Sequence, residues 1–104
     1  MMYTDYQSLI TEAIKAKKIL FIQYEKETTE RAIHPYAIYE STVGNIDLYS
    51  IQMYNPAKPA DKDKPRVFTL KSLTSVRISN TAFHVKLGYS PKNIKNCTRI
   101  IISV

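Results

Sequence analysis

The predicted strands interleave cations with aromatic side chains, and this is the strongest chemical signal of the sequence. The three combinations are Arg31 with Tyr36, Tyr49 with Arg66, and Phe68 with Lys71. Proteins hold single-stranded nucleic acid with basic grooves that follow the backbone and with aromatic rings on which bases stack. The pattern therefore predicts a binding surface for a phosphate-bearing ligand. For each ring, packing in or near the core is the alternative.

The charge balance is consistent with such a ligand. Fifteen Lys and Arg residues stand against nine Asp and Glu, which gives a net charge of +6 at pH 7 and an isoelectric point near 9.5. An isoelectric point above about 9 is typical of domains that bind nucleic acid. A lysine-coated surface without such a partner is the alternative interpretation.

The groups that catalysis needs are scarce. His34 and His84 lie in separate predicted elements without the spacing of a metal-binding pair, and two glycines cannot build a phosphate-cradling loop. The only cysteine, Cys97, precedes a predicted strand, where we expect a small packing residue rather than a catalytic thiol. We therefore expect no enzyme, no metal site and no cofactor.

Length and cysteine content limit the class of protein. The 104 residues suffice for one domain, which we take as 1–104. A single cysteine forms no internal disulfide, which indicates a reducing, cytoplasmic location. No apolar run approaches the ~20 residues of a membrane span, and MMYTDYQSLITEAIKAKK (1–18) lacks the apolar segment of a signal peptide.

The hydrophobic period changes near residue 18. Before it, apolar residues recur at helical spacing and predict an amphipathic helix over residues 5–17. The residues on its apolar face are Tyr6, Leu9, Ile10, Ala13 and Ile14. After it, the period of two predicts strands at 19–26, 31–39, 46–54, 67–70 (continuing into 75–78 after a bend) and 98–104. An exposed loop is expected over 55–65, and irregular chain over 80–96.

One helix followed by five short strands predicts a mainly β (α+β) fold. We expect the N-terminal helix to cap a five-stranded, strongly bent antiparallel barrel. Pro35 interrupts the second strand and has no N–H to donate, so it should lie at an edge or a bulge. Such a bulge would turn Tyr36 or His34 toward the mouth of the barrel. The alternative is that Pro35 only shapes the bend.

Four ordered segments resemble the WYL domain, a bacterial Sm-like small barrel usually attached to a helix-turn-helix regulator. They are LITEAIKAKKILFIQY (9–24), RAIHPYAIY (31–39), IDLYSIQMY (46–54) and PRVFTLKSLTSV (65–76), so the resemblance covers roughly 9–78. The family's Trp-Tyr-Leu reads Leu48-Tyr49-Ser50 here, and Thr69 and Ser72 stand where arginines are common. The resemblance implies an Sm-like barrel that senses a ligand in transcription regulation, here expected without the helix-turn-helix.

The family pattern and the charge together predict one concave face that binds single-stranded nucleic acid or a nucleotide. Arginines would grip phosphates, a lysine would add a point charge, and tyrosines would stack on bases. The predicted residues are Arg31, Tyr36, Tyr49, Arg66 and Lys71, with His34 and Phe68 as additional candidates.

A protein-interaction module is the alternative function. The C-terminal segment TRIIISV (98–104) is apolar and β-branched, which is typical of a strand edge that pairs with a partner. We expect a homodimer in either case. A separate DNA-binding or effector protein is a further candidate partner, and a membrane is not.

Overall fold

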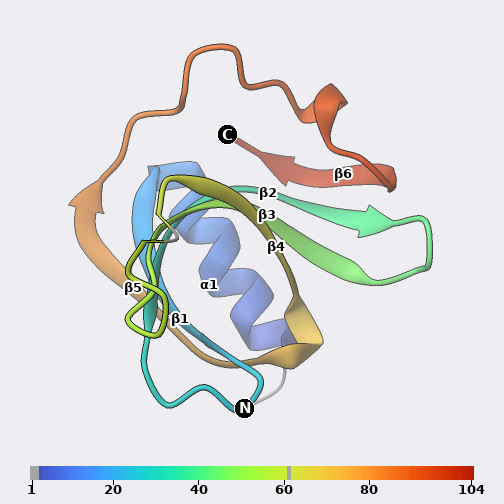
Figure 1. The fold of residues 1–104 in the computed structure, drawn as a ribbon. Coiled ribbons are helices and arrows are strands. Elements are labelled where there is room, and N and C mark those ends of the chain that lie inside the picture. The colour runs from blue at the N-terminus through green and yellow to red at the C-terminus, as the bar shows by residue number, and fades with distance from the viewer. Residues whose placement is uncertain (1–2, 61) are drawn as a thin grey trace.

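The computed structural model describes residues 3–60 and 62–104, with side chains from Tyr6 onward. One helix precedes six strands and two short 3-10 helices (Figure 1). In chain order they are α1 (Tyr3–Ala16), β1 (Lys18–Tyr24), β2 (Arg31–Ser41), β3 (Ile46–Tyr54), β4 (Lys64–Thr69), η1 (Leu70–Ser72), β5 (Leu73–Ala82), η2 (Pro91–Asn93) and β6 (Cys97–Ser103). The expected helix and the first three strands are confirmed to within two residues at each end.

The helix α1 forms for the predicted reason. Tyr6, Ile10, Ala13 and Ile14 recur on one face and are buried against the sheet, whereas Leu9 is only half-buried. The helix ends at Ala16, because Lys17 adopts a positive φ of 54°. The N–H of Lys17 still donates to the carbonyl of Ile14 at 3.2 Å, which closes the last turn.

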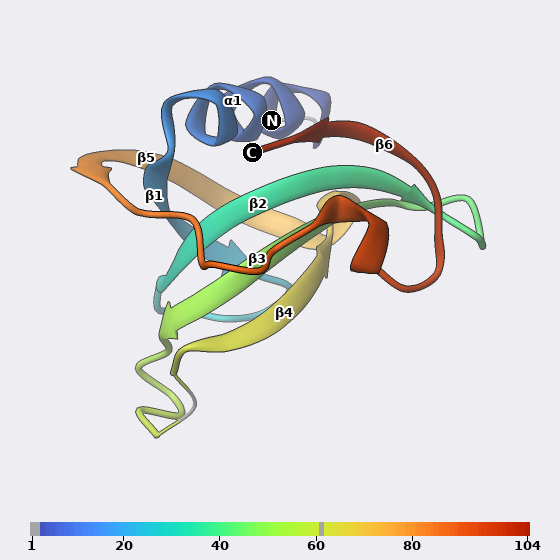
Figure 2. The ribbon, with the colours of Figure 1, turned by 90° about the horizontal axis from the view of Figure 1, so that it is seen from above.

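The six strands form one antiparallel sheet in the order β4-β3-β2-β1-β5, and β6 pairs with β2. This confirms a mainly β fold with one helix. The expected closed five-stranded barrel is not confirmed, because the sheet is open. In the described residues β4 and β5 form its two ends and do not pair with each other. Figure 2 shows α1 along one side of the curved sheet.

The predicted fourth strand is divided into two strands, which is why six strands are present instead of five. Its two halves, β4 and β5, are separated by the 3-10 turn η1. Leu70 within this turn is fully buried, and its carbonyl accepts the N–H of Leu73. The turn therefore carries the chain from one end of the sheet to the other. The strand β5 continues to Ala82, so the irregular segment is shorter than expected.

Pro35 lies beside a register shift between β2 and β3, at Pro35 and Ala37, which confirms the predicted bulge. On its other side β2 changes partner here, since pairing with β1 ends at Ile33 and pairing with β6 begins at Ala37. The missing N–H of Pro35 therefore falls where no ladder requires it. The extra residue also allows Ile33 and Ile38, an odd number of residues apart, to enter the same core.

Two groups of side chains pack on opposite faces of the sheet. We call the face toward α1 the inner face; its core is mainly aliphatic and includes Ile10, Leu20, Ile38 and Leu48, all with 0% exposure. The outer face carries a second cluster built on aromatic rings. That cluster consists of Tyr36, Ile51 and Phe83, with Ile19, Tyr49, Met53, Val85, Tyr89 and Val104 packed against it.

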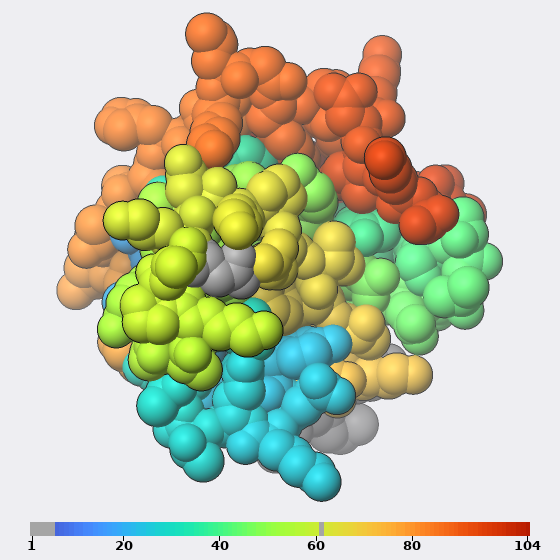
Figure 3. Space-filling view, in the orientation of Figure 1, coloured from blue at the N-terminus to red at the C-terminus, as the bar shows by residue number. Residues whose placement is uncertain are grey.

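The outer cluster is covered by the connection between β5 and β6, residues 83–96. In Figure 2 this connection crosses in front of β2 and β3, and in the space-filling view of Figure 3 it forms the upper rim of the molecule, in orange to red. Because β2 is covered on both faces, residues 35–39 are all buried. Among the described residues, no helix is long and apolar enough to span a membrane.

Candidate ligand-binding groove

Tyr36 is a structural anchor of the outer face. Its side chain is 1% exposed, and its ring stacks on Phe83 with the centroids 5.7 Å apart and meets Tyr89 edge-on at 4.7 Å. Its hydroxyl accepts the backbone N–H of Lys86 at 2.8 Å. Ring and hydroxyl are both occupied, so Tyr36 positions the connection between β5 and β6 rather than offering a stacking surface.

Tyr49 is more accessible than Tyr36. It lies on the outer face of β3 and is half-buried. Its ring is edge-on to Tyr36 at 6.3 Å and stacked with Tyr89 at 6.1 Å. Tyr49 also lines two adjoining hollows in the outer face, so it is the predicted tyrosine best placed to meet a ligand.

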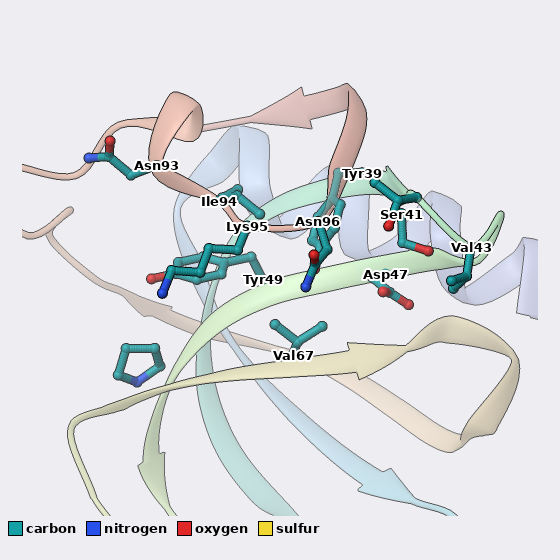
Figure 4. A pocket seen from close by; sticks show the side chains of 12 residues that line it. Tyr39, Ser41, Val43, Asp47, Tyr49, Val67, Asn93, Ile94, Lys95 and Asn96 are labelled. Carbon is teal, nitrogen blue, oxygen red and sulfur yellow. The ribbon is translucent and has the colours of Figure 1, made fainter.

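The two hollows share Tyr49, Pro65, Asn93 and Ile94, and we call them together the outer groove. The larger hollow has a volume of about 790 Å³ and the smaller about 250 Å³. The larger is lined by Tyr39, Ser41, Thr42, Val43, Asp47, Tyr49, Pro65, Val67, Asn93, Ile94, Lys95 and Asn96. Figure 4 shows that β3 and β4 form its floor and that residues 93–96 hang over it.

A carboxylate and a phenol give the larger hollow its electrostatic character, and a second phenol, Tyr89, lines the smaller hollow. Asp47 is 9% exposed, and its Oδ1 atom is buried without a hydrogen-bond partner. Burial, and next the charge of Asp47, raise the pKa of Tyr39 to about 12. Burial also raises the pKa of Tyr89, against a hydrogen bond with Ser103 that lowers it. Both phenols are therefore neutral at pH 7.

Cations lie at the rim of the outer groove. Lys95 is exposed, and it makes no ion pair with any described residue. Lys86 lines the smaller hollow, and its Nζ pairs with Asp63 Oδ1 at 3.1 Å; both side chains are more than half exposed. Exposed pairs of this kind contribute only about 0 to 1 kcal/mol, so Lys86 can exchange this partner for another anion.

Arg31 lies on the opposite side of the sheet from the outer groove. Its guanidinium forms an ion pair with Glu27, donates from Nη1 to Gln52 Oε1 at 2.8 Å, and lies 5.4 Å from the centre of the Phe68 ring. Phe68 belongs to the inner core and meets Tyr24 edge-on at 5.2 Å. The structure therefore brings Arg31 and Phe68 together, away from Tyr49.

The remaining candidates are dispersed. Arg66 lies between Pro65 and Val67, which line the outer groove, and its Nη1 donates to the carbonyl of Pro65 at 3.0 Å. Lys71 is exposed beside a separate hollow at the β2–β3 turn. His34 stacks on Phe83 with the centroids 4.5 Å apart; burial lowers its pKa, and the charge of Asp63 raises it by less. The five predicted residues thus occupy three regions rather than one face.

Sequence reasoning missed Asp47 and the segment 93–96. Asp47 looked like an ordinary polar residue of an alternating strand, and the segment had no period from which its position could follow. The clue lay in β2, where a continuous apolar stretch indicated that both faces of the sheet are covered. In the part of the chain that the structure describes, no group of three His, Cys, Asp or Glu side chains could hold a metal ion.

Comparison with known proteins supports the fold. The sequence matches no protein-family model and no curated protein. Among solved structures, part of the proteasome accessory factor B/C (PafBC) of Arthrobacter aurescens is similar, with a TM-score of 0.61 and 17% identity over 80% of this chain. The matched region spans only 13% of the length of that protein. At this identity the similarity shows a shared fold, and it shows no family and no functional residue for this chain.

Proposed function

We propose that this chain is a non-enzymatic regulatory or sensing module that binds single-stranded nucleic acid or a nucleotide in the outer groove. The observation that carries the proposal is the groove itself, an open hollow with a half-buried tyrosine ring at its centre and lysines at its rim. An aromatic stacking surface beside cations is the arrangement that proteins use for unpaired bases and their phosphates.

Uncovered apolar side chains mark the same groove. Val43 is 79% exposed and Val67 is 48% exposed, and both line the larger hollow beside Tyr49. Ligand sites are typically concave and mostly apolar, with a few polar groups that fix orientation. A base lying on Tyr49 would cover part of this apolar surface, while its phosphates stayed in water near Lys95 and Lys86.

Two further observations support the regulatory part of the proposal. The four sequence segments that resemble WYL domains imply a sensing module with an Sm-like barrel. The fold is also similar to part of a protein named as a proteasome accessory factor, which fits a small module that acts within a larger regulatory protein or beside a separate effector.

Salt dependence tests the proposal. Fluorescence anisotropy with labelled single-stranded DNA of about ten nucleotides should show binding at low salt that weakens steeply as salt is added, because phosphate contacts release counterions. Lys95→Ala should lower the salt slope by about one. Lys15→Ala removes the same charge from an exposed position on α1 and should leave the slope nearly unchanged.

Tyr49→Ala tests the stacking role. We expect a loss of about 1 to 3 kcal/mol in binding free energy, because stacking of a base on an aromatic ring contributes this much. Arg66→Ala should change binding much less, because Arg66 alternates with Pro65 and Val67 and shares the face of its cross-strand partner Ser50, away from the outer groove. The proposed function is refuted if the parent protein binds no oligonucleotide at low salt.

A second candidate function, pairing through a strand edge, follows from the sheet topology. Among the described strands β6 pairs only with β2, and β4 and β5 each pair on one side only. Ile100 on β6 is 36% exposed. A two-fold dimer would cover such an edge. Sedimentation at tens of micromolar should then give twice the 12.0 kDa chain mass, with little dependence on salt.

A further inference from the structure

Among the described residues, Oδ1 of Asp47 is the one buried side-chain nitrogen or oxygen atom without a hydrogen-bond partner. Asp47 lies on the outer face of β3, two residues before Tyr49, and lines the larger hollow. Figure 4 shows its side chain and that of Tyr49 along the same strand, with Tyr49 below Ile94 and Lys95 and Asp47 nearer Ser41 and Val43. A polar group that is nine-tenths buried thus lies inside a hollow that already has an aromatic wall.

A buried carboxylate oxygen without a hydrogen-bond partner is costly. Proteins almost always pair such groups, because burial removes the water that would otherwise solvate the charge. Here the cross-strand neighbours of Asp47 are Tyr39 and Thr69, and neither donates to it. The ligand that best fits this position therefore presents hydrogen-bond donors and no acceptor to the carboxylate.

We propose that the larger hollow binds guanine, with the Watson–Crick edge of the base on Asp47 and its ring against Tyr49. This inference rests on the proposed function and specifies which base the outer groove selects. An ionised carboxylate can only accept hydrogen bonds. Guanine offers two adjacent donors, the ring N1–H and the exocyclic amine, which match two carboxylate oxygens as the fork of an arginine does.

The other bases fit the carboxylate less well. Adenine and cytosine each place a ring-nitrogen acceptor beside the exocyclic amine, and this lone pair would face the negative charge of Asp47. Thymine and uracil offer a single N–H between two carbonyl oxygens. Only guanine can face the carboxylate with two donors and no acceptor. Asp47 would therefore select guanine by repelling the acceptor atoms of the other bases.

The rest of the hollow is consistent with this orientation. Val67 and Ile94 provide apolar walls next to Tyr49, which suit the faces and edges of a purine. Lys95 also lines the hollow, and in Figure 4 its side chain extends toward the same end as Tyr49, where the sugar-phosphate backbone would emerge. The negative charge at the floor and the positive charge at the rim would thus separate the base from its phosphate.

Oligothymidines of about ten nucleotides with one central guanine, inosine, adenine or cytosine test the inference, and the single substitution avoids four-stranded guanine structures. Anisotropy should show roughly 5- to 150-fold tighter binding with guanine than with the unsubstituted oligothymidine, the discrimination expected of a good bidentate contact. Inosine lacks only the exocyclic amine and should bind with intermediate affinity. This comparison requires no protein variant, so it does not depend on whether a variant folds.

The variant Asp47→Asn should abolish the preference for guanine while binding to oligothymidine persists or strengthens. Glu12→Gln removes one negative charge from an exposed position on α1 and should retain the preference, which controls for net charge. Equal binding of all five oligonucleotides would overturn the guanine inference and leave the proposed function standing. Binding to none of them at low salt would refute the proposed function as well.

Discussion

The two faces of the sheet are closed in different ways. On the inner face α1 lies against aliphatic side chains, and Ile10, Leu20 and Leu48 are fully buried. On the outer face the cover is an irregular connection with one 3-10 turn, the contacts are mainly between aromatic rings, and a hollow of about 790 Å³ remains open. A buried carboxylate oxygen without a partner, Oδ1 of Asp47, occurs on the outer face.

Because the two faces differ, neighbouring residues of a single strand contribute separately to stability and to ligand binding. In β3, Leu48 points into the inner core, whereas its neighbours Asp47 and Tyr49 line the outer groove. Alternation along a strand allows one residue to hold the fold while the next meets a ligand. We therefore expect substitutions on the inner face to change stability, and substitutions in the outer groove to change binding.

The largest expected effect is the loss of an inner-face side chain. Leu48→Ala should lower the free energy of unfolding by about 2 to 5 kcal/mol, because it leaves a cavity in a closed core. Val67→Ala removes apolar atoms from the outer groove, where the side chain is 48% exposed, and should cost less than about 0.5 kcal/mol. Urea denaturation of both variants measures the two values, and losses of similar size would contradict the proposed difference between the faces.

Tyr36→Phe should have an intermediate effect. The substitution keeps the ring contacts and removes the hydroxyl that accepts the N–H of Lys86, so about 0.5 to 1.5 kcal/mol of stability should be lost. Hydrogen exchange of the Lys86 amide should become faster. Tyr54→Phe, at a side chain that is 49% exposed, is the matched control. If both variants were equally stable, Tyr36 would not anchor the connection.

The inner face could be predicted from the sequence because its elements have clear periods. The helical spacing of Tyr6, Ile10 and Ile14 and the alternation in β1 and β3 determine which side chains are buried together. Pro35 was also informative, since a residue without an N–H must lie where no ladder needs one. These are local signals, and the sequence alone contains them.

The outer face could not be predicted in the same way. Phe83, Val85 and Tyr89 pack on the sheet from a connection with no regular spacing, so their positions depend on how the chain returns from β5 to β6. The division of the fourth strand at Leu70 had a similar cause, because a buried 3-10 turn resembles a bent strand in sequence. Arg31 and Tyr49 fall on opposite faces because Ile33, on the face of Arg31, pairs with Gln52, which is an odd number of residues from Tyr49 along β3.

The smallest expected effect concerns His34, which links the connection to the sheet by stacking on Phe83. Burial is the main cause that lowers its pKa below the ordinary 6.5, so the fold favours the neutral ring. The corresponding stability is complete above pH 6.5 and is lost as the pH falls through the lower pKa of the folded state. His34→Phe keeps an aromatic ring that can stack and cannot titrate. The stability of the parent relative to this variant should therefore decrease as the pH falls below 6.5.

Asp63 sharpens the same test, because its negative charge is the cause that raises the pKa of His34 against burial. In Asp63→Asn the NMR titration midpoint of the His34 ring should move further down, since only the effect of burial then remains. A midpoint that moved upward, or a parent protein whose stability relative to His34→Phe did not change between pH 7 and pH 5, would show that the ring is solvated. The aromatic cluster of the outer face would then be packed less tightly than its ring distances indicate. The outer face would differ from the inner face in its packed rings as well as in its open groove.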